Sequence, residues 1–202
     1  MAVVSAKRKA AKVDRLPKTD GAMLGVATAP ITIGKGGRVL LVGVIEREAR
    51  IEGVLTTRVA RDGTDSTARI ASMVRKSRFA PQIKFIALDG ISVAGMNVVD
   101  IARLEKRLGV SCVSITRKRP RRELMRGMVS LYGERNGIDV SRRLHLLDAT
   151  LKEPVHIEGV HLLTKIAGPR RKVILVKRAV NTIRLAHLIA SGVSRGESRG
   201  RL

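Results

Sequence analysis

Short apolar segments constrain the fold of this chain more than any other feature. Four of them, each six to nine residues long, occur in the first 88 residues, and turn-forming or charged residues separate them. Runs of this length that are rich in Val, Ile and Leu are typical of buried β-strands, whereas helices need ten or more residues. We therefore expect strands at residues 22–27, 38–45, 51–59 and 82–88, with the second and third paired as a hairpin.

The rest of the chain alternates between helical and strand patterns. The predicted helices lie at about 66–75, 98–108, 121–132 and 180–190, and Asp65 is placed to cap the first of them. The remaining predicted strands lie at residues 111–116, 155–163 and 172–176. Three strands followed by alternating helices and strands predict an α/β fold, a ribonuclease H-like mixed sheet flanked by helices. We expect a single domain over residues 21–202, preceded by a basic N-terminal arm over residues 1–20.

A net charge of +23 is the second constraint. Forty Lys and Arg residues face 17 Asp and Glu residues, and the chain has two Phe, one Tyr and no Trp. Such an excess of positive charge repels itself unless a polyanion neutralises it, which points to nucleic acid. Proteins that hold single strands stack bases on aromatic rings. A chain with so few rings is expected to contact mainly the phosphates of a folded or double-stranded nucleic acid.

The basic residues form five local clusters along the chain. Any one of them is also explained as a solvated surface, but five together favour contact with phosphates. The first cluster lies in the arm, which we expect to become ordered only on a polyanion. The candidate nucleic-acid-binding residues are Lys7, Arg8, Lys9, Lys12, Arg15, Lys18, Arg117, Lys118, Arg119, Arg121, Arg122, Arg126, Arg142, Arg143, Arg170, Arg171, Lys172, Arg195, Arg199 and Arg201.

Several classes of protein are disfavoured. No apolar run in the sequence reaches the roughly 18–20 residues that cross a bilayer, and the basic N-terminus lacks the apolar stretch of a secretory signal. Cys112 is the only cysteine, which leaves no basis for a disulfide framework or a thiolate metal cluster. We therefore expect a cytoplasmic protein without a membrane partner, and the scarcity of Asn and Gln suggests a thermophile.

Four motifs resemble those of the archaeal endonuclease dU family. They are Asp62-Gly-Thr-Asp65-Ser-Thr, Ala87-Leu-Asp89-Gly-Ile-Ser-Val-Ala-Gly-Met-Asn97-Val-Val-Asp100-Ile, Arg184-Leu-Ala-His187-Leu-Ile-Ala-Ser-Gly192 and Gly196-Glu-Ser-Arg-Gly200. The similarity runs from about residue 21 to the C-terminus. It implies a ribonuclease H-like fold related to that of endonuclease V, and metal-dependent cleavage of DNA at deoxyuridine.

The same resemblance implies that the metal site is depleted. Cleavage of this kind needs carboxylates that converge on one or two Mg²⁺ ions, and the family's first strand reads roughly Gly-Ile-Asp-Asp-Gly-Pro. The matching stretch at residues 25–30 is Gly-Val-Ala-Thr-Ala-Pro, so Ala27 and Thr28 stand at the two acidic positions. The remnant acids Asp62, Asp65 and Asp89 also suit structural roles in a turn, a helix cap and a strand end.

The histidines and the cysteine are weaker candidates for chemistry. His145, His156, His161 and His187 lack the spacing of a zinc site with cysteines. His187 lies in a helical pattern, where a buried, hydrogen-bonded histidine is the commoner outcome. Cys112 lies in an apolar strand segment and is interpreted as a core residue.

Two main classes of function remain. The charge, the arm and the missing acids favour an RNA-binding structural protein on a catalytically inactive nuclease fold, with the large ribosomal subunit as its expected place. Its partners would be structured RNA, in particular ribosomal RNA, and neighbouring ribosomal proteins, with no cofactor, metal or small-molecule substrate. The alternative is a metal-dependent endonuclease that uses Mg²⁺ and acts on deoxyuridine or another deaminated base. A nuclease-derived regulator of DNA is a third interpretation.

Overall fold

The computed structural model describes residues 21–31, 37–166 and 168–198, and its centre is a seven-stranded mixed sheet. The strands are β1 (Ala22–Thr28), β2 (Arg38–Arg47), β3 (Arg50–Ala60), β4 (Ile83–Asp89), β5 (Ser92–Val93), β6 (Asn97–Val98), β7 (Ser111–Thr116), β8 (Val155–Ile157) and β9 (Val160–Leu162). The helices are α1 (Ser66–Arg75), α2 (Ile101–Leu108), α3 (Arg122–Asn136), α4 (Ser141–Thr150) and α5 (Pro169–Arg195).

The strand order of the sheet is β3-β2-β1-β4-β7-β9-β8, while β5 and β6 form a separate small hairpin. β1, β2 and β3 pair antiparallel in chain order, as their short connections allow. β1, β4 and β7 run parallel, and α1 and α2 lie in the connections between them in the sequence. An antiparallel β1–β3 unit followed by parallel strands is the ribonuclease H-like α/β fold expected from the sequence.

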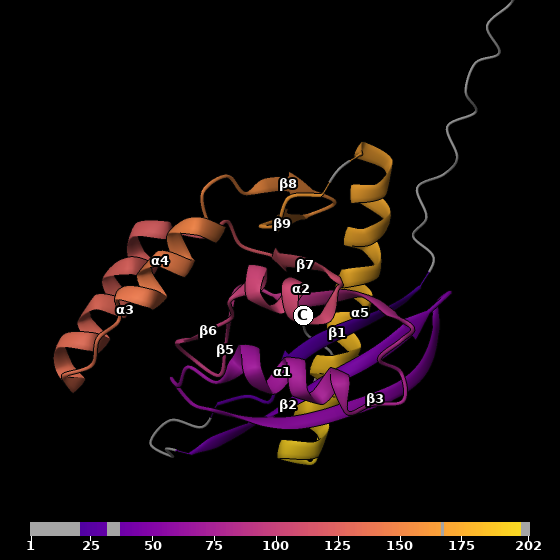
Figure 1. Cartoon of the computed structure of the whole chain (residues 1–202), viewed down its shortest axis with the longest axis horizontal. Coiled ribbons are helices and arrows are strands. Elements are labelled where there is room, and N and C mark those ends of the chain that lie inside the picture. Colours follow the sequence, from indigo (N-terminus) through magenta and orange to yellow (C-terminus); the bar gives the residue numbers. More distant parts are fainter. Residues whose placement is uncertain (1–20, 32–36, 167, 199–202) are drawn as a thin grey trace, which may run out of the picture.

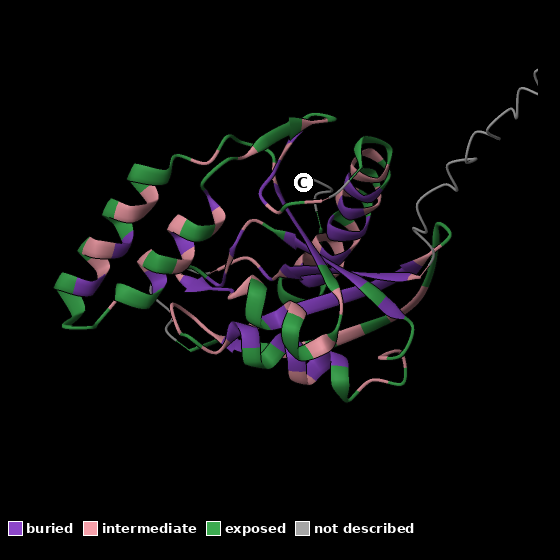
Figure 2. Ribbon diagram, turned by 45° about the horizontal axis from the view of Figure 1, so that its top comes forward, coloured by how far each residue is buried: buried purple, intermediate pink, exposed green. Residues whose placement is uncertain are grey.

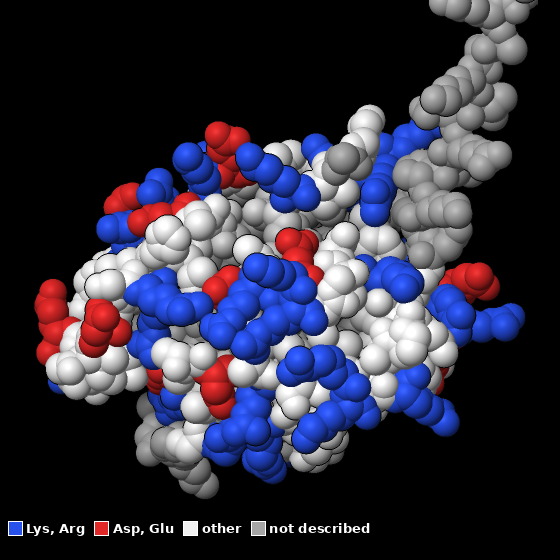
Figure 3. Space-filling view, viewed as in Figure 1, with Lys and Arg blue, Asp and Glu red and all other residues white. Residues whose placement is uncertain are grey.

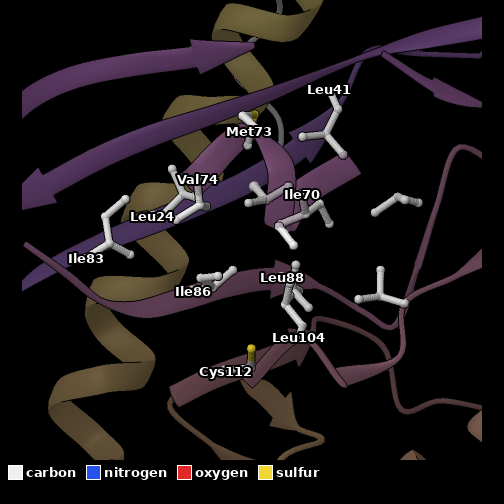
Figure 4. Close-up of a cluster of buried hydrophobic side chains, with 14 of the residues drawn as sticks. Leu24, Leu41, Ile70, Met73, Val74, Ile83, Ile86, Leu88, Leu104 and Cys112 are labelled. Carbon is white, nitrogen blue, oxygen red and sulfur yellow. The ribbon is translucent and has the colours of Figure 1, made fainter. Parts of the chain in front are cut away.

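Helices cover both faces of the sheet (Figure 1). On one face, Ile70 and Val74 of α1 pack against Leu24 and Leu88 in a core that also contains Leu104 of α2 (Figure 4). On the other face, α5 packs against β1, β4 and β7 through a second group of buried side chains. The central strands are therefore buried on both sides, which explains why they read as continuous apolar runs.

α3 and α4 form a pair beyond the end of the sheet (Figure 1). Val129 of α3 and Leu147 of α4 pack against Ile91 and Val98, which belong to the segment that follows β4. The outward faces of both helices are exposed, in contrast to the buried sheet (Figure 2). This pair extends the side of the molecule where the parallel strands end.

The predicted strand at residues 172–176 is wrong, because this segment lies inside α5. Its Val and Ile residues are typical of a strand. The buried residues of the segment, however, follow helical spacing and form one face of the helix, which contains Leu175, Ala179, Ile183 and Ala186. Helix α5 begins at Pro169, a residue well suited to the first helical turn, and runs 27 residues in place of the shorter helix predicted at 180–190.

Other boundaries differ for local reasons. The strand predicted at 155–163 is a hairpin, because Glu158 and Gly159 have φ of 51° and 78° and turn the chain. The helix predicted from residue 98 begins only at Ile101, because Asp100 accepts a hydrogen bond from the Arg103 amide and caps it. α4 was not predicted.

Cys112 is buried, as expected, and burial raises the pKa of its thiol.

The arm at residues 1–20 lies outside the described residues, so its expected role stays a prediction. The division into arm and single domain likewise stays a prediction. Within the described parts of the chain, no helix has both the length and the apolar character needed to cross a membrane.

Candidate functional site

The carboxyl ends of β1, β4 and β7 form one edge of the sheet, and Asp89 is the last residue of β4 at this edge. The last paired residues of β1 and β4 are Val26 and Leu88, so Ala27 and Asp89 follow side by side on neighbouring strands. On the other side, Asp89 pairs in register with Ile115 of β7. Loops after parallel strands meet at this edge, which is where open α/β sheets bind ligands.

Asp89 forms a hydrogen bond with His187 across this edge. The Asp89 Oδ2 and His187 Nε2 atoms are 3.0 Å apart, and the two side chains are 46% and 28% exposed. His187 reaches the strand end because α5 lies close against β1, where Gly25 leaves room for the α5 backbone at Thr182. The pair is therefore accessible from solvent, held at a strand end and able to exchange a proton.

His187 was expected to be a buried histidine, and the structure corrects this interpretation. It has the expected hydrogen-bond partner, but more than a quarter of its side chain is exposed. The sequence contained a signal, since both Asp89 and His187 lie in the family motifs, although only the fold brings residues 98 positions apart together.

Ala27 lies beside this pair and supplies no polar atom. It is 2% exposed and packs with Ala186 and Ala190 of α5. Within the described residues, no group of three His, Cys, Asp or Glu side chains could hold a metal ion. The site therefore offers one carboxylate and one imidazole where the resemblance implied several acids.

Asp65 does not cap α1 through its side chain, so that part of the prediction is wrong. Its Oδ1 accepts hydrogen bonds from the Ala60 amide and the Asn97 side chain, while Oδ2 faces Arg38 and Arg69. Burial by itself raises the pKa of Asp65, but these hydrogen bonds and the Arg38 charge hold it below its ordinary value of 3.8. Its carboxylate is engaged in joining β3 to the β5–β6 hairpin.

Asp62 occupies a turn, as expected. It has φ of 52°, and its Oδ1 accepts a hydrogen bond from the Met96 amide at 2.8 Å. Arg61 lies 3.3 Å from its other oxygen. Asp62 and Asp65 thus connect the end of β3 to the β5–β6 hairpin through hydrogen bonds. Neither of them forms a metal-binding group with Asp89.

The second basic cluster of the sequence lies at the same sheet edge as Asp89. Arg117, Lys118, Arg119 and Arg121 come directly after β7 and are exposed, and we call these four residues the edge cluster. Because β7 pairs with β4, these four exposed, basic residues follow the strand next to the one that ends at Asp89.

Other members of the clusters have protein partners. Arg122 and Arg126 both pair with Asp148 of α4, and the Arg126 hydrogen bond holds the pKa of that carboxyl below its ordinary value. Arg142 pairs with Asp100 at 3.0 Å. Arg143 was expected to bind nucleic acid, and the structure corrects this interpretation. Its side chain is only 6% exposed and donates hydrogen bonds to the Asp62 and Gly63 carbonyl oxygens. It holds α4 to the Asp62 turn and is not available to phosphate.

The fourth and fifth clusters lie at opposite ends of α5. Arg170, Arg171 and Lys172 are in its first turn, about 25 Å along the helix from His187, whereas Arg195 is about 12 Å beyond it. Arg199 and Arg201 lie outside the described residues, as do Lys7, Arg8, Lys9, Lys12, Arg15 and Lys18. Phosphate binding by the exposed members stays a prediction.

Sequence reasoning missed a further basic surface over α1 and α2. Lys and Arg side chains gather in the middle of the view in Figure 3, over these two helices. They were not recognised because they are spread through the sequence and only helical spacing brings them to one face. The exposed basic residues of the two helices and the α1 C-cap are Arg69, Arg75, Lys76, Arg103, Lys106 and Arg107.

The fold and this edge define a ribonuclease H-like protein with a basic surface and a solvent-accessible Asp–His pair at the carboxyl ends of its parallel strands. Comparison with known proteins agrees: the model of the family described as endonuclease dU matches residues 21–194. The chain therefore belongs to the endonuclease dU family, as its motifs indicated.

Curated relatives from archaea support this membership. A "UPF0215 protein" of Methanothermobacter thermautotrophicus is 35% identical over 190 residues, covering 91% of this chain and 92% of the relative. Another, from Methanopyrus kandleri, is 34% identical over 175 residues, covering 80% and 85%. The crystal structure of a protein of unknown function from Archaeoglobus fulgidus is similar with a TM-score of 0.75 and 28% identity, covering 88% of this chain and 100% of that one.

Proposed function

We propose that this protein is a divergent endonuclease of the dU family, which binds DNA through its phosphates and cleaves it near a deaminated base at the Asp89–His187 pair. The observation that carries the proposal is this pair, 3.0 Å apart and accessible, at the strand edge next to the edge cluster. Family membership over residues 21–194 supports it. The ribosomal role expected from the charge gains no such support.

In this proposal the edge cluster and the neighbouring basic surfaces hold the phosphate backbone. Phosphate contacts position a nucleic acid without reading its sequence. The Asp89 carboxylate orients the His187 imidazole through their hydrogen bond, as a carboxylate does for a catalytic histidine. His187 is then placed to take or give a proton at an oxygen of the scissile phosphodiester.

The residues present fit Mg²⁺ only together with substrate. Mg²⁺ keeps several waters and is often held by one or two carboxylates plus substrate phosphates. Asp89 is one such carboxylate and is nearly half exposed, whereas the neighbouring Ala27 has no ligand atom. When bound, the ion would prepare a water for attack and neutralise charge on the leaving oxygen. A resident ion held by the protein alone does not fit the described donor set.

A second candidate function is binding of nucleic acid without cleavage. Ala27 favours it, because the side chain at the position where the family carries an acid is buried among alanines of α5. The RNA-binding structural role in a ribosome, expected from the charge, is one form of this candidate. It predicts that the protein sediments with ribosomes at low salt.

Cleavage of matched DNA duplexes tests the proposal. Two labelled duplexes that differ at one position, deoxyuridine or thymidine, are incubated with an excess of protein and Mg²⁺ or Mn²⁺, with a chelator control. We expect cleavage of the deoxyuridine duplex that needs the metal and falls at least about 100-fold in His187→Ala, within the range for loss of a general acid or base. The matched control is His145→Ala, an exposed histidine on α4.

The outcomes separate the two candidates. Tight binding of both duplexes without cleavage supports the second candidate and contradicts the first. Cleavage that is unaffected by His187→Ala contradicts the assignment of the site even if the protein is a nuclease. Sedimentation of a cell extract then decides whether a binding protein is ribosomal.

A further inference from the structure

The β8–β9 hairpin carries two histidines directly opposite each other. Its two-residue turn, Glu158-Gly159, has positive φ at both positions, as a type I′ turn requires. Ile157 and Val160 close the turn, and His156 pairs with His161 one step further along. Hydrogen-bonded and non-hydrogen-bonded pairs alternate along an antiparallel ladder, and the pair that closes a two-residue turn is hydrogen-bonded. His156 and His161 therefore form a non-hydrogen-bonded pair, in which the Cα atoms are closer, about 4.5 Å apart.

Both imidazoles lie on the solvent side of the hairpin. Val160 and Leu162 are buried against α5, so His161 between them faces the opposite side of the sheet. His156 is exposed and His161 is partly exposed. Glu158 at the turn pairs with Lys177 of α5 at 3.5 Å, so its carboxylate is drawn to the α5 side and away from the imidazoles.

The two rings have the separation of imidazoles that share one metal ion. Their centres are 5.0 Å apart with the planes tilted by 56°. With metal–nitrogen bonds of about 2.0–2.1 Å, two imidazoles at a right or tetrahedral angle around one ion have ring centres about 4.5 to 5.2 Å apart. The observed separation of the ring centres therefore lies within the range for two imidazoles on one ion.

We propose that His156 and His161 form a bidentate binding site for a divalent transition-metal ion of the Zn²⁺ class. Imidazole nitrogen is a preferred ligand for such ions, whereas Mg²⁺ prefers oxygen. No third His, Cys, Asp or Glu of the described residues completes the set, so water or an external oxygen ligand occupies the remaining coordination positions. The site is exposed and is expected to exchange its ion readily.

This site is distinct from the Asp89–His187 pair. His161 pairs with Thr116 of β7, and the neighbouring strand β4 carries Asp89, so two strand spacings, about 10 Å, separate them. The two sites also lie on opposite faces, because Ile115 and Leu162 share the face of α5. Thr116 directly precedes Arg117 of the edge cluster, so a bound ion adds positive charge next to that cluster.

Zinc titration of the tag-free full chain tests this proposal. Protein stripped with a chelator is titrated with ZnCl₂ in competition with a chromophoric chelator. We expect one saturable site for Zn²⁺. Its affinity should fall at least about tenfold in His156→Gln and in His161→Gln, because loss of a residue that only hydrogen-bonds to a metal ligand already costs about that much. His145→Gln on α4 is the matched control and should bind like the unmodified protein. Zn²⁺ should also raise the Tm of the unmodified protein but not of the double variant.

Three results would overturn the proposal. One is the absence of saturable binding to the unmodified protein. Another is equal affinity in the His156→Gln/His161→Gln double variant. The third is loss of binding in His187→Gln alone, which would assign the ion to the Asp89 edge and leave the hairpin without a role.

Discussion

Replacement of Gly25 by alanine tests the contact that positions the functional site. Gly25 lies in the middle of β1, where α5 crosses the sheet. A Cβ atom built there would lie 2.7 Å from the Ile183 amide nitrogen and 2.7 Å from the Thr182 Cβ. Ordinary contact begins at about 3.4 Å, and one of the obstructing groups is helix backbone that cannot rotate away.

The magnitude follows from this geometry. α5 must move away from β1 by at least about 0.7 Å, or the strand must bend by a similar amount. Overpacking of a close-packed core costs about 1–3 kcal/mol. His187 lies one helical turn beyond Ile183, so the same movement lengthens its hydrogen bond to Asp89. We expect Gly25→Ala to lose stability and, where the protein cleaves DNA, activity as well.

Urea unfolding measures the effect. Gly192→Ala is the matched control, because Gly192 lies in the same helix with a helical backbone and nothing within 4 Å of an added Cβ. Alanine there should stabilise the protein by up to about 1 kcal/mol. Equal midpoints for Gly25→Ala and the unmodified protein would refute the close packing of α5 on β1 and, with it, the placement of His187.

Three further predictions concern charges. Replacement of the edge cluster by Gln should lower the log–log salt slope of DNA binding by about 3 to 4, since each neutralised phosphate contributes about 0.9. Counted per replaced charge, the same change at Arg170 and Lys172, at the far end of α5, should lower the slope less, and equal effects per charge would contradict binding at the carboxyl edge. Arg143→Met should cost about 1–3 kcal/mol in urea unfolding, because two carbonyls lose their donor. Arg142→Met, at an exposed ion pair, should cost under about 1 kcal/mol, and a larger loss than for Arg143→Met would contradict this account. The pKa of Asp65 is lowered in the fold, so its contribution to stability is present above its ordinary pKa of 3.8 and is lost as the pH falls below it. Asp65→Asn should flatten acid unfolding in that range, and an unchanged pH profile would show that Asp65 does not stabilise the loops.

The sequence predicted the first four strands and β7 closely. β1, β2, β4 and β7 have mainly apolar, buried centres, and their predicted bounds lie within two residues of the observed ones. The half-exposed strand β3 was predicted equally well, because its polar and apolar residues alternate. Local patterns failed where a buried face belongs to a long helix rich in Val and Ile, as in α5, and where two positive φ angles divide an apolar run, as between β8 and β9.

The functional site was predictable only in part. The motifs pointed to Asp89 and to the missing acid at Ala27, and the parallel register places these positions side by side. The partner of Asp89 depended on how α5 crosses the sheet, which one sequence does not contain. The engagement of Asp65 by Ala60 and Asn97, and the burial of Arg143, likewise arise from contacts between segments far apart in the chain.

The central claim is that the Asp89 carboxylate, with the substrate phosphate, is enough to support cleavage despite Ala27. Single-turnover cleavage of a deoxyuridine duplex by Asp89→Asn, next to the unmodified protein and the exposed-acid control Glu153→Gln, tests it most directly. We predict metal-dependent cleavage by the unmodified protein and by Glu153→Gln, and a loss of at least about 100-fold in Asp89→Asn. Equal rates for all three proteins, or no cleavage by any of them while the duplex remains bound, would contradict the claim.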